Sequence, residues 1–298
     1  MLPPALQRHI EGALGSEVES TTTATGGFSP ATRERILLRD GRRAFVKAGT
    51  DADTRAWLRD EWRVYGALSR PFLPEVLHWS DTEAVLVLED LGDCERAPPW
   101  TGRAVAAVVA TLAEVAATPP PPDVPAIDPS PFRGWQRSLW SLQSIATLGA
   151  ATPEWLQSHG PVLARAEAAA RISGDSLLHC DVRGDNLFLR GGRAILVDWN
   201  WSVRGNAAVD RAFWAPSLQL DGGPPPEQVV GHEPELAAAV AGFFAYQAVQ
   251  PIEQATPAIR AFQVAQLRQA LPWAARALGL PLEGVTTAQA ASGHGMSL

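Results

Sequence analysis

One short segment of this chain gathers most of the residues that could do chemistry. Residues 178–199 read Leu-His-Cys-Asp-Val-Arg-Gly-Asp-Asn-Leu-Phe-Leu, then Arg-Gly-Gly-Arg, then Ala-Ile-Leu-Val-Asp-Trp. Gly191 and Gly192 lie between two apolar runs, and this pattern predicts a β-hairpin. Counted outward from the turn, Asn186 and Asp198 lie at the open end of the hairpin, roughly opposite each other.

The side chains at that open end are oxygen donors. The amide oxygen of Asn186 and the carboxylate of Asp198, held side by side, would make a site suited to magnesium. Asp181 lies on the loop that leads into the first arm, where it can reach the same spot without binding the metal. Phosphoryl transfer needs such a set, because a separate carboxylate must orient the attacking hydroxyl and accept its proton. Asp, Asn and Gly are also ordinary turn residues, but the added hairpin and Asp198 favour the chemical interpretation.

A second pair of charged residues lies in the first third of the chain. Glu61 falls on the apolar stripe of a predicted helix, between Trp57 and Val64. A buried carboxylate without a partner is costly, so a cation should meet it. Lys47, at the end of the preceding apolar strand, is the nearest candidate. A Lys–Glu pair that positions nucleotide phosphates is typical of kinases, and a purely structural ion pair is the alternative.

Glycines near the amino terminus and the absence of other phosphate loops complete the inventory. The segment Thr25-Gly26-Gly27-Phe28-Ser29 precedes the first strand, and the backbone amides of such a turn can bind phosphate. Two glycines alone more often just make a turn. No Walker loop and no Rossmann glycine pattern occurs in the sequence.

The elements that must position these residues fall into two parts. The first part is β-rich, with a hairpin at Asp40-Gly41, one helix whose start resembles a capping box at Thr50 and Asp53, and a strand at 84–88. Helical, Ala-rich patterns follow from about residue 101 and include helices at 234–249 and 258–278, the latter kinked or broken at Pro272. We therefore expect an α+β protein with a boundary near residue 92.

Composition narrows the class of protein. The chain has 25 Lys and Arg against 32 Asp and Glu, a formal charge of -7, which argues against a nucleic-acid partner. Its apolar stretches are too short and Ala-rich to span a membrane. The two cysteines, Cys94 and Cys180, are too few and too far apart for a disulfide framework, and the first 20 residues lack a signal pattern. These features predict a cytoplasmic protein.

The order of the motifs resembles the aminoglycoside phosphotransferase and choline kinase family, which shares the protein-kinase fold. The matching segments, in sequence order, are Gly26-Gly27-Phe28-Ser29, Lys47, Glu61, Leu88-Glu89-Asp90-Leu91-Gly92, the loop 179–186, Val197-Asp198-Trp199 and Asp210. The resemblance covers nearly the whole chain up to the last helices. It implies a bilobal fold, with a small β-rich nucleotide-binding lobe at 1–92 and a larger, mainly helical lobe at 93–298.

The resemblance also implies a role for each catalytic position. Asp181 would be the catalytic base, and Asn186 and Asp198 would be the ligands of Mg²⁺. Lys47, oriented by Glu61, would contact the α- and β-phosphates of ATP or GTP.

Further positions would complete the nucleotide site. In the linker Glu89-Asp90-Leu91, backbone groups of Glu89 and Leu91 would hold the purine. The turn with Gly26, Gly27 and Ser29 would lie over the phosphates, and Asp210 would brace the catalytic loop.

Two positions depart from the family pattern. Cys180 stands where the family usually has glycine, and Arg183 stands where a second histidine is common. The cysteine narrows the loop but removes no functional group. Arg183 could pair with Asp185 or brace the transferred phosphate, and both roles stay open.

The acceptor is expected to be a small hydroxylated molecule bound in the second lobe. Acidic and aromatic residues there could form a wall suited to the ammonium groups of an aminoglycoside: Trp199, Trp201, Trp214, Asp221, Glu227, Glu233 and Glu235. The alternative is that the tryptophans fill the core and the acids are solvated. Three functions follow: phosphorylation of an aminoglycoside-like antibiotic, giving resistance; phosphorylation of a metabolite such as a sugar or amino alcohol; or a regulatory role as a nucleotide-binding pseudokinase.

Overall fold

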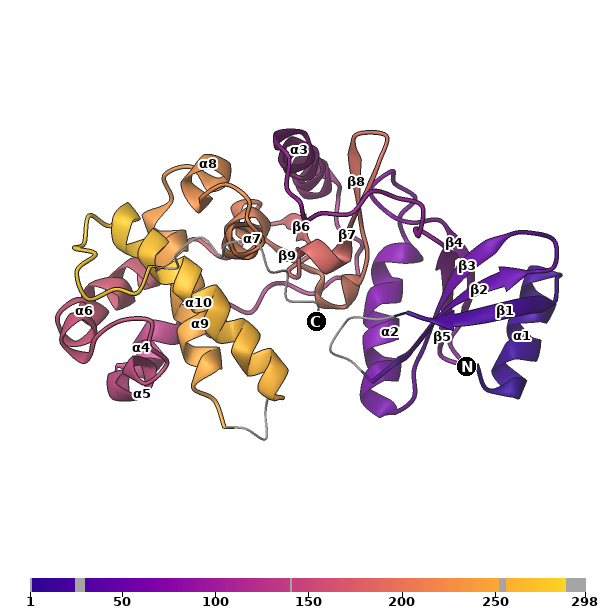
Figure 1. Ribbon diagram of the computed structural model, residues 1–298, viewed down its shortest axis with the longest axis horizontal. Helices are drawn as coiled ribbons and strands as arrows, with labels where there is room; N and C mark the ends of the chain where they lie inside the picture. The colour runs from indigo at the N-terminus through magenta and orange to yellow at the C-terminus, as the bar shows by residue number, and fades with distance from the viewer. Residues whose placement is uncertain (1, 25–29, 140, 252–255, 288–298) are drawn as a thin grey trace.

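The computed structural model of the protein shows two lobes joined by a narrow waist (Figure 1). It describes residues 2–24, 30–139, 141–251 and 256–287. One lobe is a sheet with two helices, and the other is built mainly of helices (Figure 1). This arrangement confirms the predicted α+β class with a small β-rich and a larger helical lobe.

A five-stranded antiparallel sheet with strand order β1-β2-β3-β5-β4 forms the core of the first lobe. Its strands are β1 (Val18–Thr23), β2 (Thr32–Leu38), β3 (Arg43–Ala48), β4 (Val76–Ser80) and β5 (Val85–Glu89). Gly41 has a φ of 86° in the turn between β2 and β3, a conformation that glycine adopts without strain. Four consecutive residues of β5 are buried because both faces of this interior strand are covered.

The two helices of this lobe pack on opposite sides of the sheet. Helix α1 (Pro4–Leu14) places Ile10 and Leu14 against Ile36 and Val87 of the sheet. Helix α2 (Ala52–Tyr65) lies on the side that faces the second lobe (Figure 1). The helix begins with a capping box formed by Asp51 and Thr54. Both positions lie one residue further along the chain than the capping-box-like start predicted at Thr50 and Asp53.

The second lobe contains the remaining α-helices of the described chain, two short antiparallel strand pairs, β6-β9 and the hairpin β7-β8, and three 3₁₀ turns. Its helices are α3 (Gly102–Ala117), α4 (Gly134–Ser138), α5 (Leu142–Ala146), α6 (Pro153–Ala169), α7 (Ala208–Leu220), α8 (Pro226–Val230), α9 (Pro234–Ala248) and α10 (Pro257–Ala277). Its strands are β6 (Ser176–Leu178), β7 (Leu187–Arg190), β8 (Arg193–Leu196) and β9 (Val203–Gly205), with 3₁₀ turns η1 (Ser130–Phe132), η2 (Gly184–Asn186) and η3 (Trp199–Trp201).

Helix α9 ends one residue before its predicted limit, and in α10 the structure excludes one of the two predicted alternatives, a break at Pro272. The chain continues as one helix through Pro272, so the helix is not broken there. Pro272 is buried between Leu271 and Trp273, both of which are fully buried. A proline removes one backbone hydrogen bond, and here core packing on both sides keeps the helix intact.

One apolar cluster spans both lobes. Leu58 of α2 and Leu86 of β5 pack in the same core as Leu187 of β7, Leu196 of β8 and Val108 of α3. The backbone N–H of Leu196 also donates to the carbonyl of Phe72 at 2.9 Å. The hairpin is thus held against the first lobe by burial of its apolar arms.

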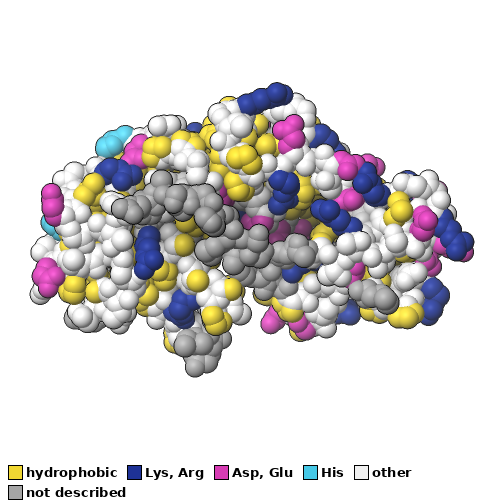
Figure 2. Space-filling view, viewed as in Figure 1, with side chains coloured by type: hydrophobic (Ala, Val, Ile, Leu, Met, Phe, Trp, Pro, Cys, Tyr) yellow, Lys and Arg dark blue, Asp and Glu magenta, His cyan; other side chains and the backbone are white. Residues whose placement is uncertain are grey.

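The surface carries charges of both signs. Figure 2 shows basic and acidic side chains intermixed over one face, with acidic atoms visible at the waist between the lobes. In the described part of the chain, no helix is long and apolar enough to cross a membrane.

The crossing of α4 and α9 depends on two glycines and gives a test of the fold. A Cβ atom on Gly134 would lie 1.8 Å from the carbonyl oxygen of Gly242. We expect Gly134→Ala to lower the free energy of unfolding by about 1–3 kcal/mol or more through overpacking. Gly12→Ala, in α1, is the control, because a Cβ there meets nothing within 4 Å. Equal urea midpoints for Gly134→Ala and wild type would contradict this account.

Candidate active site

The hairpin brings two of the predicted site residues together. Strands β7 and β8 pair in antiparallel register, with Leu187 opposite Leu196. Beyond this pair, the Val197 N–H donates to the Asn186 carbonyl at 3.1 Å. Asn186 and Asp198 therefore leave the open end of the hairpin side by side, as the turn count predicts.

Asn186 has a fixed amide orientation. Its Nδ2 donates both to the backbone carbonyl of Asp181 and to Oδ2 of Asp181, each at 2.9 Å. Because the amide nitrogen is turned toward Asp181, the amide oxygen points the other way. The same contact ties the predicted base to one predicted metal ligand.

The residues present fit a magnesium ion. Mg²⁺ binds proteins through one or two oxygen side chains and completes its shell with substrate phosphates and water. Within the described residues, no group of three or more His, Cys, Asp or Glu could hold a metal ion. Asn186 and Asp198 would hold the ion from one side only, and a nucleotide would have to supply the rest.

Lys47 joins the two lobes by ion pairs. Its Nζ lies 2.7 Å from Oε2 of Glu61 on α2 and 2.5 Å from Oδ1 of Asp198 after β8. Only 10% of the Lys47 side chain and 2% of the Glu61 side chain are exposed. The predicted Lys47–Glu61 pair is therefore present, and Asp198 is an additional partner.

The three groups influence one another's ionisation: burial raises the pKa of Glu61, and the Lys47 ammonium opposes that rise. Burial lowers the pKa of Lys47, but the attraction of Glu61 and Asp198 outweighs burial and raises it overall. Burial works to raise the pKa of Asp198, and the neighbouring Lys47 ammonium brings it below its ordinary value. Lys47 and Asp198 thus remain ionised near neutral pH.

Asp181 has the environment of a base. Burial, the largest influence, raises the pKa of its carboxyl group to about 7, and the charge of Asp198 acts in the same direction. Arg183 opposes the shift, with its Nε 3.4 Å from Oδ1 of Asp181. Arg183 also pairs with Asp185 at 2.9 Å, which is one of the two roles left open above. A carboxylate with a pKa near the working pH is suited to accept a proton.

The loop that carries Asp181 is held by buried polar groups. Asp210, at the start of α7, accepts the backbone N–H groups of His179 and Cys180, both at 2.8 Å. His179 is fully buried, and burial lowers the pKa of its imidazole to about 4, so the ring is neutral. The Val197 carbonyl at 2.9 Å can only accept, so Nε2 carries the proton, and Nδ1 accepts from the Asp181 N–H at 3.2 Å.

Cys180 and Asp198 adopt left-handed backbone conformations. Their φ angles are 61° and 71°. A left-handed conformation costs roughly 1–2 kcal/mol for a residue with a side chain. At position 180 this explains why glycine suits the loop and why cysteine is a departure.

The carboxylates of the predicted linker are hydrogen-bonded to other groups of the protein. Glu89 accepts from Arg190 at 2.6 and 3.0 Å, and Asp90 accepts the Gly92 N–H at 3.0 Å. Leu91 is buried. Any contact of this linker with a purine would thus involve backbone groups. Gly26, Gly27 and Ser29 lie outside the described residues.

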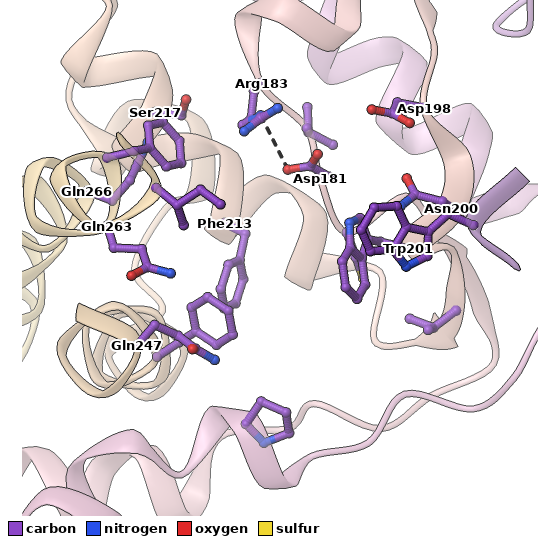
Figure 3. A pocket seen from close by; sticks show the side chains of 18 of the residues that line it. Asp181, Arg183, Asp198, Asn200, Trp201, Phe213, Ser217, Gln247, Gln263 and Gln266 are labelled. Atoms are coloured by element: carbon purple, nitrogen blue, oxygen red, sulfur yellow. Dashed lines mark ion pairs between the residues drawn. The ribbon is translucent and has the colours of Figure 1, made fainter. Parts of the chain in front are cut away.

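A cavity of about 640 Å³ extends from Lys47 and Asp198 into the second lobe. Asp181 and Arg183 also line the cavity, and Asp181 lies on the side toward Asp198 (Figure 3). Seven aromatic side chains contribute to its wall: Trp57, Phe132, Trp201, Phe213, Phe243, Phe244 and Phe262. The cavity is therefore open to an acceptor whose hydroxyl group must reach Asp181.

The wall predicted for an acceptor is present only in part. Trp201 lines the cavity and is 57% exposed, whereas Trp199 and Trp214 are fully buried core residues. The acidic residues predicted for the wall, Asp221, Glu227, Glu233 and Glu235, are not among the cavity-lining residues in the described chain. Glu227 instead pairs with Arg276 at 2.7 Å.

Sequence reasoning missed the residues of α7, α9 and α10 that line the cavity. Gln247, Gln263 and Gln266 are examples, together with Phe213 and Phe262. The available signal was a polar residue on the apolar side of a helix: Gln266 lies one turn before the buried Ala270, on the same face.

The Lys47–Glu61 pair predicts a large effect on stability. Lys47→Ala leaves Glu61 buried without its cation, and we expect the free energy of unfolding to fall by about 3–5 kcal/mol. Adding Glu61→Gln should restore part of the loss, because a neutral amide needs no counter-charge. Urea unfolding of both variants measures this. An unchanged midpoint for Lys47→Ala would show that Glu61 is solvated or paired elsewhere.

The pKa of Asp181 predicts a pH dependence. The carboxylate must be ionised to accept a proton, so kcat/KM for the acceptor should fall about tenfold per pH unit below about pH 7. Arg183→Gln removes a charge that lowers this pKa and should move the acid limb to higher pH. Residual activity of Asp181→Asn should lack this limb. A profile of kcat/KM that is flat from pH 5 to 8 would contradict the assignment.

Comparison with known proteins identifies the family of the chain. Residues 20–243 match the phosphotransferase enzyme family. No curated protein sequence matches the chain. Choline kinase LicA from Streptococcus pneumoniae is similar in structure, with 13% identity, coverage of 92% of this chain and 98% of that chain, and a TM-score of 0.60.

Two further solved structures share the fold. The ADP-bound aminoglycoside phosphotransferase APH(2'')-Ib has 14% identity, covers 90% of this chain and 98% of that chain, and has a TM-score of 0.55. Macrolide 2'-phosphotransferase MphH from Brachybacterium faecium is 19% identical in sequence, and its TM-score is 0.54. The match covers 89% of this chain and 98% of that chain. These likenesses and the family match confirm the resemblance inferred from the motifs. The chain belongs to the phosphotransferase enzyme family and is a small-molecule kinase that phosphorylates a hydroxyl group.

Proposed function

We propose that the protein transfers the terminal phosphoryl group of ATP or GTP, in the presence of Mg²⁺, to a hydroxyl group of a small molecule. One observation carries the proposal. Asp181 and Asn186 are hydrogen-bonded to each other, and Lys47 pairs with both Glu61 and Asp198 at the same end of the cavity. This is the set that phosphoryl transfer requires, with a base, two oxygen ligands and a lysine for the phosphates.

The proposed roles follow from these contacts. Asp181 accepts the proton of the acceptor hydroxyl as its oxygen forms a bond to the γ-phosphorus and the bond to the leaving ADP or GDP breaks. Lys47, held by Glu61, contacts the α- and β-phosphates. Asn186 and Asp198 hold Mg²⁺, which, when bound, neutralises charge on the phosphates.

The remaining assignments belong to the nucleotide. Backbone groups of Glu89 and Leu91, in the linker with Asp90, would hold the purine, and Gly26, Gly27 and Ser29 would lie over the phosphates. The ADP bound to the aminoglycoside phosphotransferase named above supports a nucleotide co-substrate. We place the boundary between the lobes after residue 92, and the two free cysteines favour a cytoplasmic location.

The acceptor class has two candidates. The first is an aminoglycoside-like antibiotic, supported by the gentamicin complex of a similar aminoglycoside phosphotransferase. The second is a metabolite such as a sugar or an amino alcohol, supported for amino alcohols by the similar choline kinase. The complete catalytic set disfavours a regulatory pseudokinase. Antibiotic resistance would follow only from the first candidate.

Phosphoryl transfer by the purified protein tests the proposal. The protein is incubated with ATP or GTP, with and without Mg²⁺, and with aminoglycosides, sugars and amino alcohols. Mass spectrometry then detects a phosphorylated product.

We expect Asp181→Asn to lower turnover by about 10²–10⁴ with the fold intact. Asp198→Ala should abolish magnesium-dependent nucleotide binding. Equal turnover of Asp181→Asn and wild type would remove Asp181 from the mechanism.

A further inference from the structure

The acceptor side of the cavity is walled by aromatic rings that pack on one another. Phe213 lies edge-on to Phe132, with ring centroids 5.1 Å apart, and edge-on to Phe243 at 5.2 Å. Phe243 in turn meets Phe244 at 5.3 Å. Rings that are fixed by each other form a preorganised apolar surface, which binds apolar molecules at a low entropic cost.

The cavity has no surplus of negative charge for a polycation. Its acidic residues are Asp128, Asp181 and Asp198, and its basic residues are Arg33, Lys47 and Arg183. Asp181 and Asp198 already face Arg183 and Lys47. Asp128 is exposed, and its carboxylate accepts the N–H and the hydroxyl of Ser130 at 2.9 and 2.7 Å. A molecule with several ammonium groups would therefore find few free carboxylates among the described residues.

Two glutamine side chains in this wall have buried polar atoms without a hydrogen-bond partner among the described residues. Gln266 of α10 is 1% exposed, and neither its Oε1 nor its Nε2 has a hydrogen-bond partner among the described residues. The Oε1 of Gln263, one turn earlier, is in the same state. A buried amide left unpaired costs about 1–3 kcal/mol, so such a group calls for an explanation.

The position of the glutamines supplies the explanation. Gln266 and Gln263 both line the cavity. Figure 3 shows them on the opposite side of the cavity from Asp198 and Trp201, with Phe213 between the two sides. A molecule whose hydroxyl group meets Asp181 would extend past the phenylalanines and present its far part to the glutamines.

We propose that the acceptor is an uncharged, largely apolar hydroxylated molecule, and that Gln266 recognises on it a neutral group that both donates and accepts hydrogen bonds, such as a second hydroxyl or an amide. This inference rests on the proposed phosphotransferase function and specifies its substrate. An amide offers one acceptor and one donor face, so it discriminates a neutral polar group from an ammonium, which can only donate. The cavity of about 640 Å³ is within the range of sites that hold drug-sized ligands.

Two matched compound sets test the acceptor class. Wild-type protein with Mg²⁺ and ATP or GTP is assayed by mass spectrometry against neutral, apolar compounds with at least two hydroxyl or amide groups, and against aminoglycosides and amino alcohols of similar size. We expect phosphorylated products to come mainly from the neutral set. Products confined to the cationic set, or the absence of any product from the neutral set, would overturn the inference.

Gln266→Leu tests the recognising group with the best neutral acceptor. Leucine has a similar size, so the protein should fold, and its melting temperature should rise because an unpaired amide is removed. We expect KM for the acceptor to increase about 10- to 100-fold, with the Kd for magnesium–ATP unchanged. Gln269→Leu is the control, since Gln269 is also buried on α10 but lies outside the cavity lining, and it should not change KM. An unchanged KM in Gln266→Leu would overturn the role of this residue.

The outcomes separate this inference from the function on which it rests. If aminoglycosides or amino alcohols are phosphorylated and Asp181→Asn abolishes the reaction, the phosphotransferase proposal stands and the neutral acceptor is wrong. If wild-type protein neither binds magnesium–ATP nor phosphorylates any compound of either set, both proposals are wrong.

Discussion

The site depends on one buried cation. Lys47 lies between Glu61 on α2 and Asp198 at the end of the hairpin, so a single ammonium group connects elements from both lobes. Removing the Lys47 ammonium would leave the Glu61 carboxylate without a cation in a poorly solvated place, where the penalty is several kcal/mol. The network therefore constrains where the sheet, α2 and the hairpin can lie relative to each other.

The rest of the structure keeps that network in place. The apolar arms of the hairpin pack in a core shared with α2 and β5. This packing fixes the position of the end of β8, and therefore of Asp198, relative to the first lobe. On the other side, Asp210 and the neutral His179 hold the backbone of the loop that carries Asp181. Reactive carboxylates thus sit on backbone that is immobilised by buried hydrogen bonds, so their geometry does not depend on flexible side chains.

Local signals in the sequence predicted the part of the site that is local. The hairpin follows from a glycine pair between apolar runs, and the need of Glu61 for a cation follows from its place on an apolar stripe. Other contacts join helices and strands that are distant in the sequence. Examples are the contact of Lys47 with Asp198 and the cavity wall that contains Phe213 and Gln266. A short sequence pattern does not predict contacts of this kind. The sequence left open whether α10 is kinked or broken at Pro272, and the helix is not broken because packing from other elements outweighs the lost hydrogen bond.

The left-handed backbone at Cys180 has a consequence for how this loop can evolve. Glycine, asparagine and aspartate tolerate such a conformation, whereas β-branched residues are excluded from it. Cysteine and glycine codons differ by one base, so a lineage can pass between the two residues in a single mutation, without an intermediate that distorts the backbone beside Asp181. Because Cys180 takes part in the loop through its backbone N–H, which donates to Asp210, the exchange keeps this hydrogen bond whichever of the two side chains is present.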